Sequence, residues 1–166
     1  MSDKLRIYTM QARLTVNTYF SAAHRLARPD LDYTTNCGVY GKCARPHGHG
    51  HNYHLDVTVR GEVNPRTGMV VELGALRHLI QEVVIEPLDH RFLNKDIPHF
   101  ETVVPTAENI AIYIRDLLLH PLQELGLSLD KLRLYESPNN SCELYGTMGG
   151  DRQKTSTQEK TKLLLV

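Results

Sequence analysis

The chain has 166 residues, a length that fits one domain with a substantial buried core. Its 19 basic and 19 acidic residues balance, which argues against nucleic acid or a membrane surface as a partner. No apolar run follows the charged start or could span a bilayer, so the sequence predicts a cytoplasmic protein whose three cysteines are reduced thiols.

Alternating apolar and polar residues predict two long strands in the first half of the chain. In the first, residues 12–26, the alternation places His24 on the apolar face. In the second, residues 51–62, it turns Tyr53, Leu55, Val57 and Val59 inward and His54 outward. A loop punctuated by Gly and Pro, residues 27–50, is expected between them.

Two helices are predicted to follow. Apolar residues recur at helical spacing from Leu73 to Val84, and Pro87 is expected to stop this helix. The second begins at Thr106, a good N-cap, with Glu108 in the first turn, where the helix dipole favours an acid. Gly126 is expected to end it.

Two final strands, residues 131–136 and 141–148, flank a hairpin signal at 138–140. The predicted fold is α+β, a four-stranded antiparallel sheet with two helices layered on one face. Residues 1–148 are expected to form this single domain. Residues 149–166 are expected to be a loose polar C-terminal tail.

Histidine is concentrated in one 31-residue stretch, which holds five of the nine: His24, His47, His49, His51 and His54. His49 and His51, two apart on a strand, point the same way and can reach one ion, and His24 can supply a third ligand. Three imidazoles leave a Zn²⁺ ion one open position, whereas structural zinc sites close with four ligands. A lone inward histidine is more often a core residue, but the pair favours a metal site.

Several motifs occur in order and together resemble the 6-pyruvoyl-tetrahydropterin synthase family over residues 12–148: Phe20-Ser21-Ala22-Ala23-His24-Arg25-Leu26, Gly41-Lys42-Cys43, Gly48-His49-Gly50-His51-Asn52-Tyr53, Pro87-Leu88-Asp89-His90, Thr106-Ala107-Glu108-Asn109 and Tyr135-Glu136. The resemblance implies zinc held by His24, His49 and His51. It also implies the tunnelling fold, in which trimers close their sheets into a barrel and two trimers stack into a homohexamer. Pterin sites then lie between subunits.

The resemblance assigns acid–base roles to three residues. Cys43, isolated, would be taken for a small inert residue, but near zinc the thiolate is favoured and can act as a base. The pair Asp89-His90, which a polar helix end could also explain, would relay protons, with part of the set coming from a neighbouring subunit. Cys37 and Cys142 match no motif and are interpreted as structural.

Glu136 shares a strand face with Leu132 and Leu134, which should be buried. A buried carboxylate is costly unless it is paired, and the N–H donors of an amino-pyrimidine would suit it. The family uses its matching glutamate as this anchor; the alternative is that the side chain turns into solvent. Thr106 and Glu108 match positions near the pterin, although helix capping alone would explain them.

The implied reaction converts 7,8-dihydroneopterin triphosphate to 6-pyruvoyl-tetrahydropterin and triphosphate, on the route to tetrahydrobiopterin. Arg25, Lys42 and Arg45 are candidates for holding the phosphates. One alternative is the sister enzyme that makes 6-carboxy-tetrahydropterin, and a second is a non-catalytic zinc-binding module with a fourth protein ligand.

The number of residues between Cys43 and the two ligand histidines that follow it differs between the pyruvoyl and carboxy branches of the family. The ligand pair His47 and His49 would give the short spacing of the carboxy branch, and His49 and His51 the longer spacing of the pyruvoyl branch. The sequence distance from His51 to Gly61-Glu62, which ends the strand, matches the second ligand and favours the pyruvoyl branch. A histidine at position 47 is then a departure from the sequence pattern of that branch.

Overall fold

The computed structural model describes residues 10–146, so the predicted tail, residues 149–166, and the end of the predicted strand 141–148 lie outside the described residues. One sheet has the strand order β3-β1-β2-β4-β5. The strands are β1 (Gln11–His24), β2 (His49–Glu62), β3 (Arg91–Phe92), β4 (Ser128–Ser137) and β5 (Asn140–Tyr145). The long strands β1 and β2 pair antiparallel along their whole length, from Gln11 opposite Glu62 to His24 opposite His49.

The α+β class is confirmed, but the expectation of a four-stranded antiparallel sheet was wrong. A fifth strand, β3, pairs parallel with β1 at Ala22 and Ala23, which makes the sheet mixed. With two residues, β3 is too short to show any alternation in the sequence. It forms where the chain leaving the first helix passes beside the end of β1, in the same direction as β1.

Both predicted helices are present. The first is continuous over α2 (Leu73–Ile80), a π-helical stretch (Gln81–Ile85) and α3 (Glu86–Leu88), so it ends one residue after Pro87. The second is α5 (Ala107–Glu124), and the Thr106 side chain caps it by accepting a hydrogen bond from the backbone N–H of Asn109 at 3.3 Å. No helix within residues 10–146 combines the length and apolar character needed to cross a membrane.

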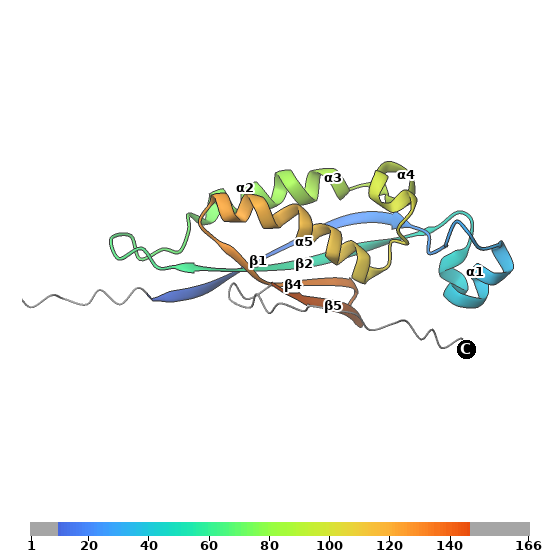
Figure 1. Ribbon diagram of the computed structural model, residues 1–166, viewed down its shortest axis with the longest axis horizontal. Helices are drawn as coiled ribbons and strands as arrows, with labels where there is room; N and C mark the ends of the chain where they lie inside the picture. Colours follow the sequence, from blue (N-terminus) through green and yellow to red (C-terminus); the bar gives the residue numbers. More distant parts are fainter. Residues whose placement is uncertain (1–9, 147–166) are drawn as a thin grey trace, which may run out of the picture.

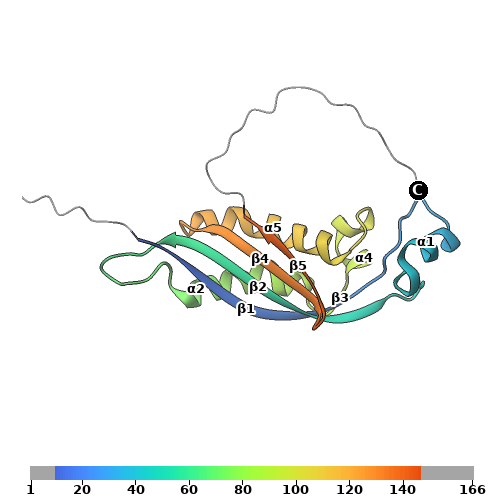
Figure 2. The same ribbon diagram turned by 90° about the horizontal axis from the view of Figure 1, so that it is seen from below.

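The helices α2, α3 and α5 lie along one face of the sheet, as Figures 1 and 2 show. The core forms between them, and the four β2 residues predicted to point inward, Tyr53, Leu55, Val57 and Val59, are fully buried. From α5, Ile110, Ile114 and Leu118 pack into the same core. The alternation in the sequence therefore gave the correct face for β2.

The segment predicted as a loop contains the helix α1 (Tyr33–Tyr40) and a 3₁₀ turn (Gly41–Ala44) beyond the ends of β1 and β2 (Figure 1). Asp32 caps α1 by accepting from the N–H of Thr35 at 2.7 Å. α1 has no apolar stripe that the sequence could reveal. Two further short elements, α4 (Leu93–Asp96) and a 3₁₀ turn (Pro98–Glu101), lead from β3 toward α5.

Candidate metal centre and substrate cavity

Three histidines meet at one end of the β1–β2 ladder. His24 is the register partner of His49, and His51 lies two residues farther along β2 on the same face. One nitrogen from each ring lies within 4.8 Å of the other two. The Nε2 atoms of His24 and His49 are 3.2 Å apart, close to the separation of about 3.3 Å that two nitrogens adopt on a tetrahedral zinc with bonds of about 2.0–2.1 Å.

The tautomer of His24 is set by its other nitrogen. Nδ1 lies 2.7 Å from the carbonyl oxygen of Pro105, so it carries the proton and donates it. Nε2 is then left with a free lone pair that points at His49. Burial lowers the pKa of His24 to about 4, so the ring is neutral near pH 7, as a metal ligand must be.

His51 supplies the clearest sign that the cluster fits a cation. Its Nε2 atom is buried, and no described residue gives it a hydrogen-bond partner. An unpaired buried polar atom costs about 1–3 kcal/mol unless something satisfies it. Burial also lowers the pKa of His49, so neutral, basic nitrogens face one another here. The three histidines could therefore hold a metal ion.

Gly48 is required by the close approach of the two strands. Its φ is +67°, a left-handed conformation that side chains resist. A Cβ at this position would lie 2.6 Å from the carbonyl oxygen of His24. The chain can therefore enter β2 directly beside His24 only because residue 48 has no side chain.

Glu136 lies beside the histidines. Its Oε1 atom is 3.6 Å from Nε2 of His24 and 3.7 Å from Nε2 of His51, and its side chain is 21% exposed. The pairing of β4 with β5 is irregular at this residue. Leu132 and Leu134 on the same strand are fully buried, as predicted.

A cavity of about 480 Å³ opens between the start of α5 and the β4–β5 hairpin. The three residues expected to bind substrate, Thr106, Glu108 and Glu136, all line it. Cys142 lines it as well; burial, together with the charges of Glu108 and Glu136, raises the pKa of this thiol. Two carboxylates, Glu108 from α5 and Glu136 from β4, suit a ligand rich in N–H donors.

Asp89 and His90 form a hydrogen-bonded pair, with Oδ2 of Asp89 2.8 Å from Nδ1 of His90. The backbone of Ser21 holds both residues: its N–H donates to Oδ1 of Asp89 at 2.8 Å, and its carbonyl accepts from the N–H of His90 at 2.6 Å. The bond from Ser21 lowers the pKa of Asp89. His90 has a φ of +57°, a strained conformation for a non-glycine residue, and its side chain is 82% exposed.

Cys43 lies in the 3₁₀ turn before β2 and is half-buried. Within residues 10–146 of one chain, no hydrogen bond joins it to Asp89 or His90. His90, but not Asp89, borders a second cavity, of about 550 Å³, together with Ser21, His51 and Asn52. His47 and His54 are exposed and lie outside the histidine cluster.

Several residues that shape this site were not singled out from the sequence. The Tyr53 hydroxyl lies 3.3 Å from Nδ1 of His24, and the Pro105 carbonyl and Ser21 backbone act through main-chain atoms. Main-chain contacts between positions far apart leave no residue pattern. No sequence signal could have identified the two main-chain contacts, whereas the inward face predicted for Tyr53 did point to its side chain.

Known proteins resemble this chain over most of its length. A family model described as 6-pyruvoyl tetrahydropterin synthase matches residues 13–147. The 6-pyruvoyl tetrahydrobiopterin synthase of Pongo abelii is 46% identical over 130 residues, covering 78% of this chain and 88% of that protein. A solved 6-pyruvoyl tetrahydropterin synthase from Caenorhabditis elegans superposes with a TM-score of 0.79 at 37% identity, covering 85% of this chain and 100% of that one. The 6-carboxy-5,6,7,8-tetrahydropterin synthase of Haemophilus influenzae is 29% identical, covering 64% of this chain and 86% of that protein.

Proposed function

The chain belongs to the 6-pyruvoyl tetrahydropterin synthase family, and we propose that it uses zinc to convert 7,8-dihydroneopterin triphosphate into 6-pyruvoyl-tetrahydropterin and inorganic triphosphate. The observation that carries the proposal is the convergence of three histidine nitrogens, one of them buried and unpartnered, beside a carboxylate that lines a cavity. An all-nitrogen set of three ligands suits zinc and leaves one position for substrate.

Two observations favour the pyruvoyl branch. The relative of that branch is 46% identical and the carboxy-branch relative 29% identical. The histidine cluster also contains His49 and His51 but not His47, which gives the longer spacing from Cys43. A non-catalytic zinc module would enclose the metal with four protein ligands. The side chain next to the three histidines is Glu136, and it lines an open cavity, which argues against such a module.

Bound zinc would act as a Lewis acid toward the hydroxyl and carbonyl oxygens of the substrate side chain. His24, His49 and His51 would hold it. We assign to Cys43 the removal of a proton from the side-chain carbon. Asp89 holds the ring of His90 through Nδ1, which leaves Nε2 to carry protons as the side chain rearranges. Triphosphate leaves by elimination, without consumption of water, which makes the enzyme a carbon–oxygen lyase.

Glu108 and Glu136 would divide the contacts with the substrate. The carboxylate of Glu136 lies 3.6 Å from a histidine nitrogen, so a pterin anchored by it alone would have its N–H edge against the metal. Glu108 lines the same cavity from the first turn of α5. We infer that Glu108 takes part of the N–H edge with Glu136, while Thr106 shapes the wall and caps the helix. For the phosphates, Lys42 and Arg45 are exposed near Cys43.

The proposed assembly is a hexamer of two stacked trimers whose sheets close into a barrel. In the described chain, the outer edge of β5 has no partner strand, and β3 covers only two residues of β1. Unpaired strand edges are sites for pairing with another chain. Such pairing would bring Asp89 and His90 of one subunit to Cys43 of the next.

Subunit mixing tests this arrangement. C43A and H90A should each be strongly impaired alone, and mixtures refolded together should regain part of the activity, because some interfaces then combine one intact Cys43 with one intact His90. Sedimentation should give six chains. A monomer with full activity, or mixtures without any recovery, would contradict shared sites.

Product analysis tests the reaction itself. The zinc-loaded protein is incubated with 7,8-dihydroneopterin triphosphate, and the products are identified by mass spectrometry. We expect released triphosphate and a pterin that retains all three side-chain carbons. 6-Carboxy-tetrahydropterin with acetaldehyde would instead indicate the sister branch. No turnover, with zinc held by four protein ligands, would indicate a non-catalytic module.

A further inference from the structure

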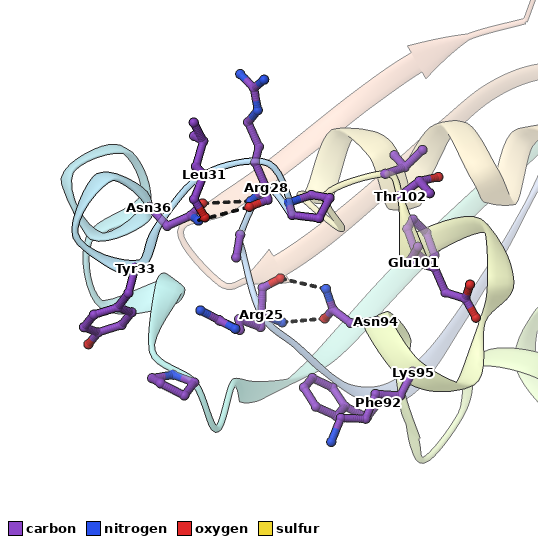
Figure 3. A pocket seen from close by; sticks show the side chains of 15 residues that line it. Arg25, Arg28, Leu31, Tyr33, Asn36, Phe92, Asn94, Lys95, Glu101 and Thr102 are labelled. Carbon is purple, nitrogen blue, oxygen red and sulfur yellow. Dashed lines mark hydrogen bonds between the residues drawn. The ribbon is translucent and has the colours of Figure 1, made fainter.

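Arg25 follows the metal-binding residue His24, at the point where the regular sheet ends. The ladder between β1 and β2 stops at His24 opposite His49, and the pairing of β1 with β3 stops at Ala23 opposite Phe92. The side chain of Asn94 continues the pairing. Its Oδ1 accepts from the N–H of Arg25 at 2.7 Å, and its Nδ2 donates to the carbonyl of Arg25 at 3.0 Å (Figure 3).

The guanidinium of Arg25 reaches the turn that carries Cys43. Its Nε atom donates to the carbonyl oxygen of Ala44 at 2.9 Å, and Ala44 is fully buried. One residue farther along, the N–H of Leu26 donates to the carbonyl of Cys43 at 2.9 Å. Two adjacent residues of one segment thus bind the two adjacent carbonyls of the other.

We propose that Arg25 is a positioning residue that holds the Cys43 turn in place against the end of β1 that carries His24. The inference rests on the proposed function, in which Cys43 is the base that must reach a substrate held at the metal. Without the Arg25 guanidinium, only one of these two hydrogen bonds would remain, the one from the N–H of Leu26 to the carbonyl of Cys43. A misplacement of about 1 Å can cost about a hundredfold in rate, so the cysteine needs this support.

A phosphate-binding role for Arg25 is the competing interpretation. Against it, the Nε atom is already bound to Ala44, and the cavity that Arg25 lines, of about 340 Å³, is bordered by Phe92, Asn94 and Glu101 rather than by the metal histidines. The two roles make different kinetic predictions. A phosphate ligand contributes to substrate binding, whereas a positioning residue contributes to turnover.

The test uses the zinc-loaded protein with Arg25→Met, Arg25→Lys and, as control, Arg28→Met. Arg28 lines the same cavity, but its guanidinium is paired with Asp30 at 2.6 and 3.0 Å, away from the Cys43 turn. For R25M we expect a kcat lower by about 10- to 100-fold, a KM within about twofold, and unchanged zinc content. R25K, which keeps one donor, should recover part of kcat, and R28M should match the parent protein.

Hydrogen exchange gives a second readout that needs no substrate. Amides of residues 41–45 should exchange faster in R25M, while those of β2 stay as protected as in the parent. Should R25M fail to fold, Asn94→Ala removes the clamp on Arg25 but keeps the guanidinium, and it should lower kcat in the same direction by a smaller factor.

Three results would overturn the inference: a raised KM with normal kcat, a loss of zinc, or normal exchange with normal kcat. Failure of the proposed function would look different. In that case the parent protein would not turn over the pterin triphosphate, while R25M would still exchange its amides faster than the parent.

Discussion

Nδ1 of His24 lies 2.7 Å from the carbonyl oxygen of Pro105, a residue 81 positions later in the chain. Pro105 directly precedes Thr106, the N-cap of α5. The start of this helix therefore fixes which nitrogen of His24 carries its proton and leaves Nε2 free for a metal. A second contact made through the ligand's other nitrogen commonly strengthens metal binding in this way.

His51→Ala should remove most of the bound metal and all activity, because two histidines with the half-buried carboxylate of Glu136 nearby are a weaker set of ligands. Metal content after dialysis, measured by plasma emission, checks this. His47→Ala and His54→Ala serve as controls, since both side chains are exposed and outside the cluster. Tight stoichiometric metal in H51A would remove His51 from the ligand set.

The metal-free protein should lose stability as the pH falls from 6.5 toward 4. In this window the unfolded chain protonates His24, with a pKa of 6.5, whereas the folded chain, with a pKa of about 4, does not. Above pH 6.5 both states are neutral and the effect vanishes. Proton linkage over this window amounts to about 3 kcal/mol.

Urea denaturation of chelator-treated protein at pH 7.5, 6 and 5 measures this loss. His24→Asn, which does not titrate, should flatten the pH dependence. Some slope should remain, because burial also lowers the pKa of His49. An identical slope in H24N and the parent protein would show that His24 is not the group responsible.

Cys43→Ala should keep the fold and the metal but lower turnover by about a hundredfold to ten-thousandfold, the usual effect of removing a general base. Steady-state kinetics and metal analysis of the same sample test both parts. Cys37→Ala is the matched control, because Cys37 lies in α1 and has no assigned role. Normal turnover in C43A would refute the assignment.

Glu136→Gln and Glu108→Gln should each weaken binding of a pterin by about tenfold, since each loses a charged hydrogen-bond acceptor. Calorimetric titration with neopterin measures this. In cobalt-substituted protein, only E136Q should change the metal spectrum, because Glu136 is the carboxylate 3.6 Å from a histidine nitrogen. Unchanged pterin affinity in E136Q would leave Glu108 as the anchor.

Gly48→Ala should destabilise the protein by about 1–3 kcal/mol and weaken metal binding, because the new Cβ would lie 2.6 Å from the His24 carbonyl in a left-handed backbone. Thermal unfolding with and without metal tests both effects. Gly38→Ala is the control: a Cβ there meets nothing within 4 Å, so the helix should be unchanged or slightly more stable. Equal effects of the two changes would contradict this account.

The sequence alone determined the features that depend on local periodicity. Alternation placed His24, Tyr53 and Leu55 on the buried face, and the helical repeat and the Thr106 cap located both long helices. The spacing of His49 and His51 predicted that their side chains share a face of β2. These inferences succeeded because a side chain's face is set by its own strand or helix.

Tertiary structure decided what depends on contacts between distant segments. It revealed β3, whose two residues are too few to show a strand pattern in the sequence. It also revealed the hydrogen bond from His24 to Pro105, which uses a main-chain oxygen. It also placed the carboxylate of Glu136 beside the three clustered histidines, whereas the sequence predicted a buried face and a pterin anchor but not this contact. Such contacts are set by how β1, β4 and the start of α5 pack together, and no spacing within one segment encodes that packing.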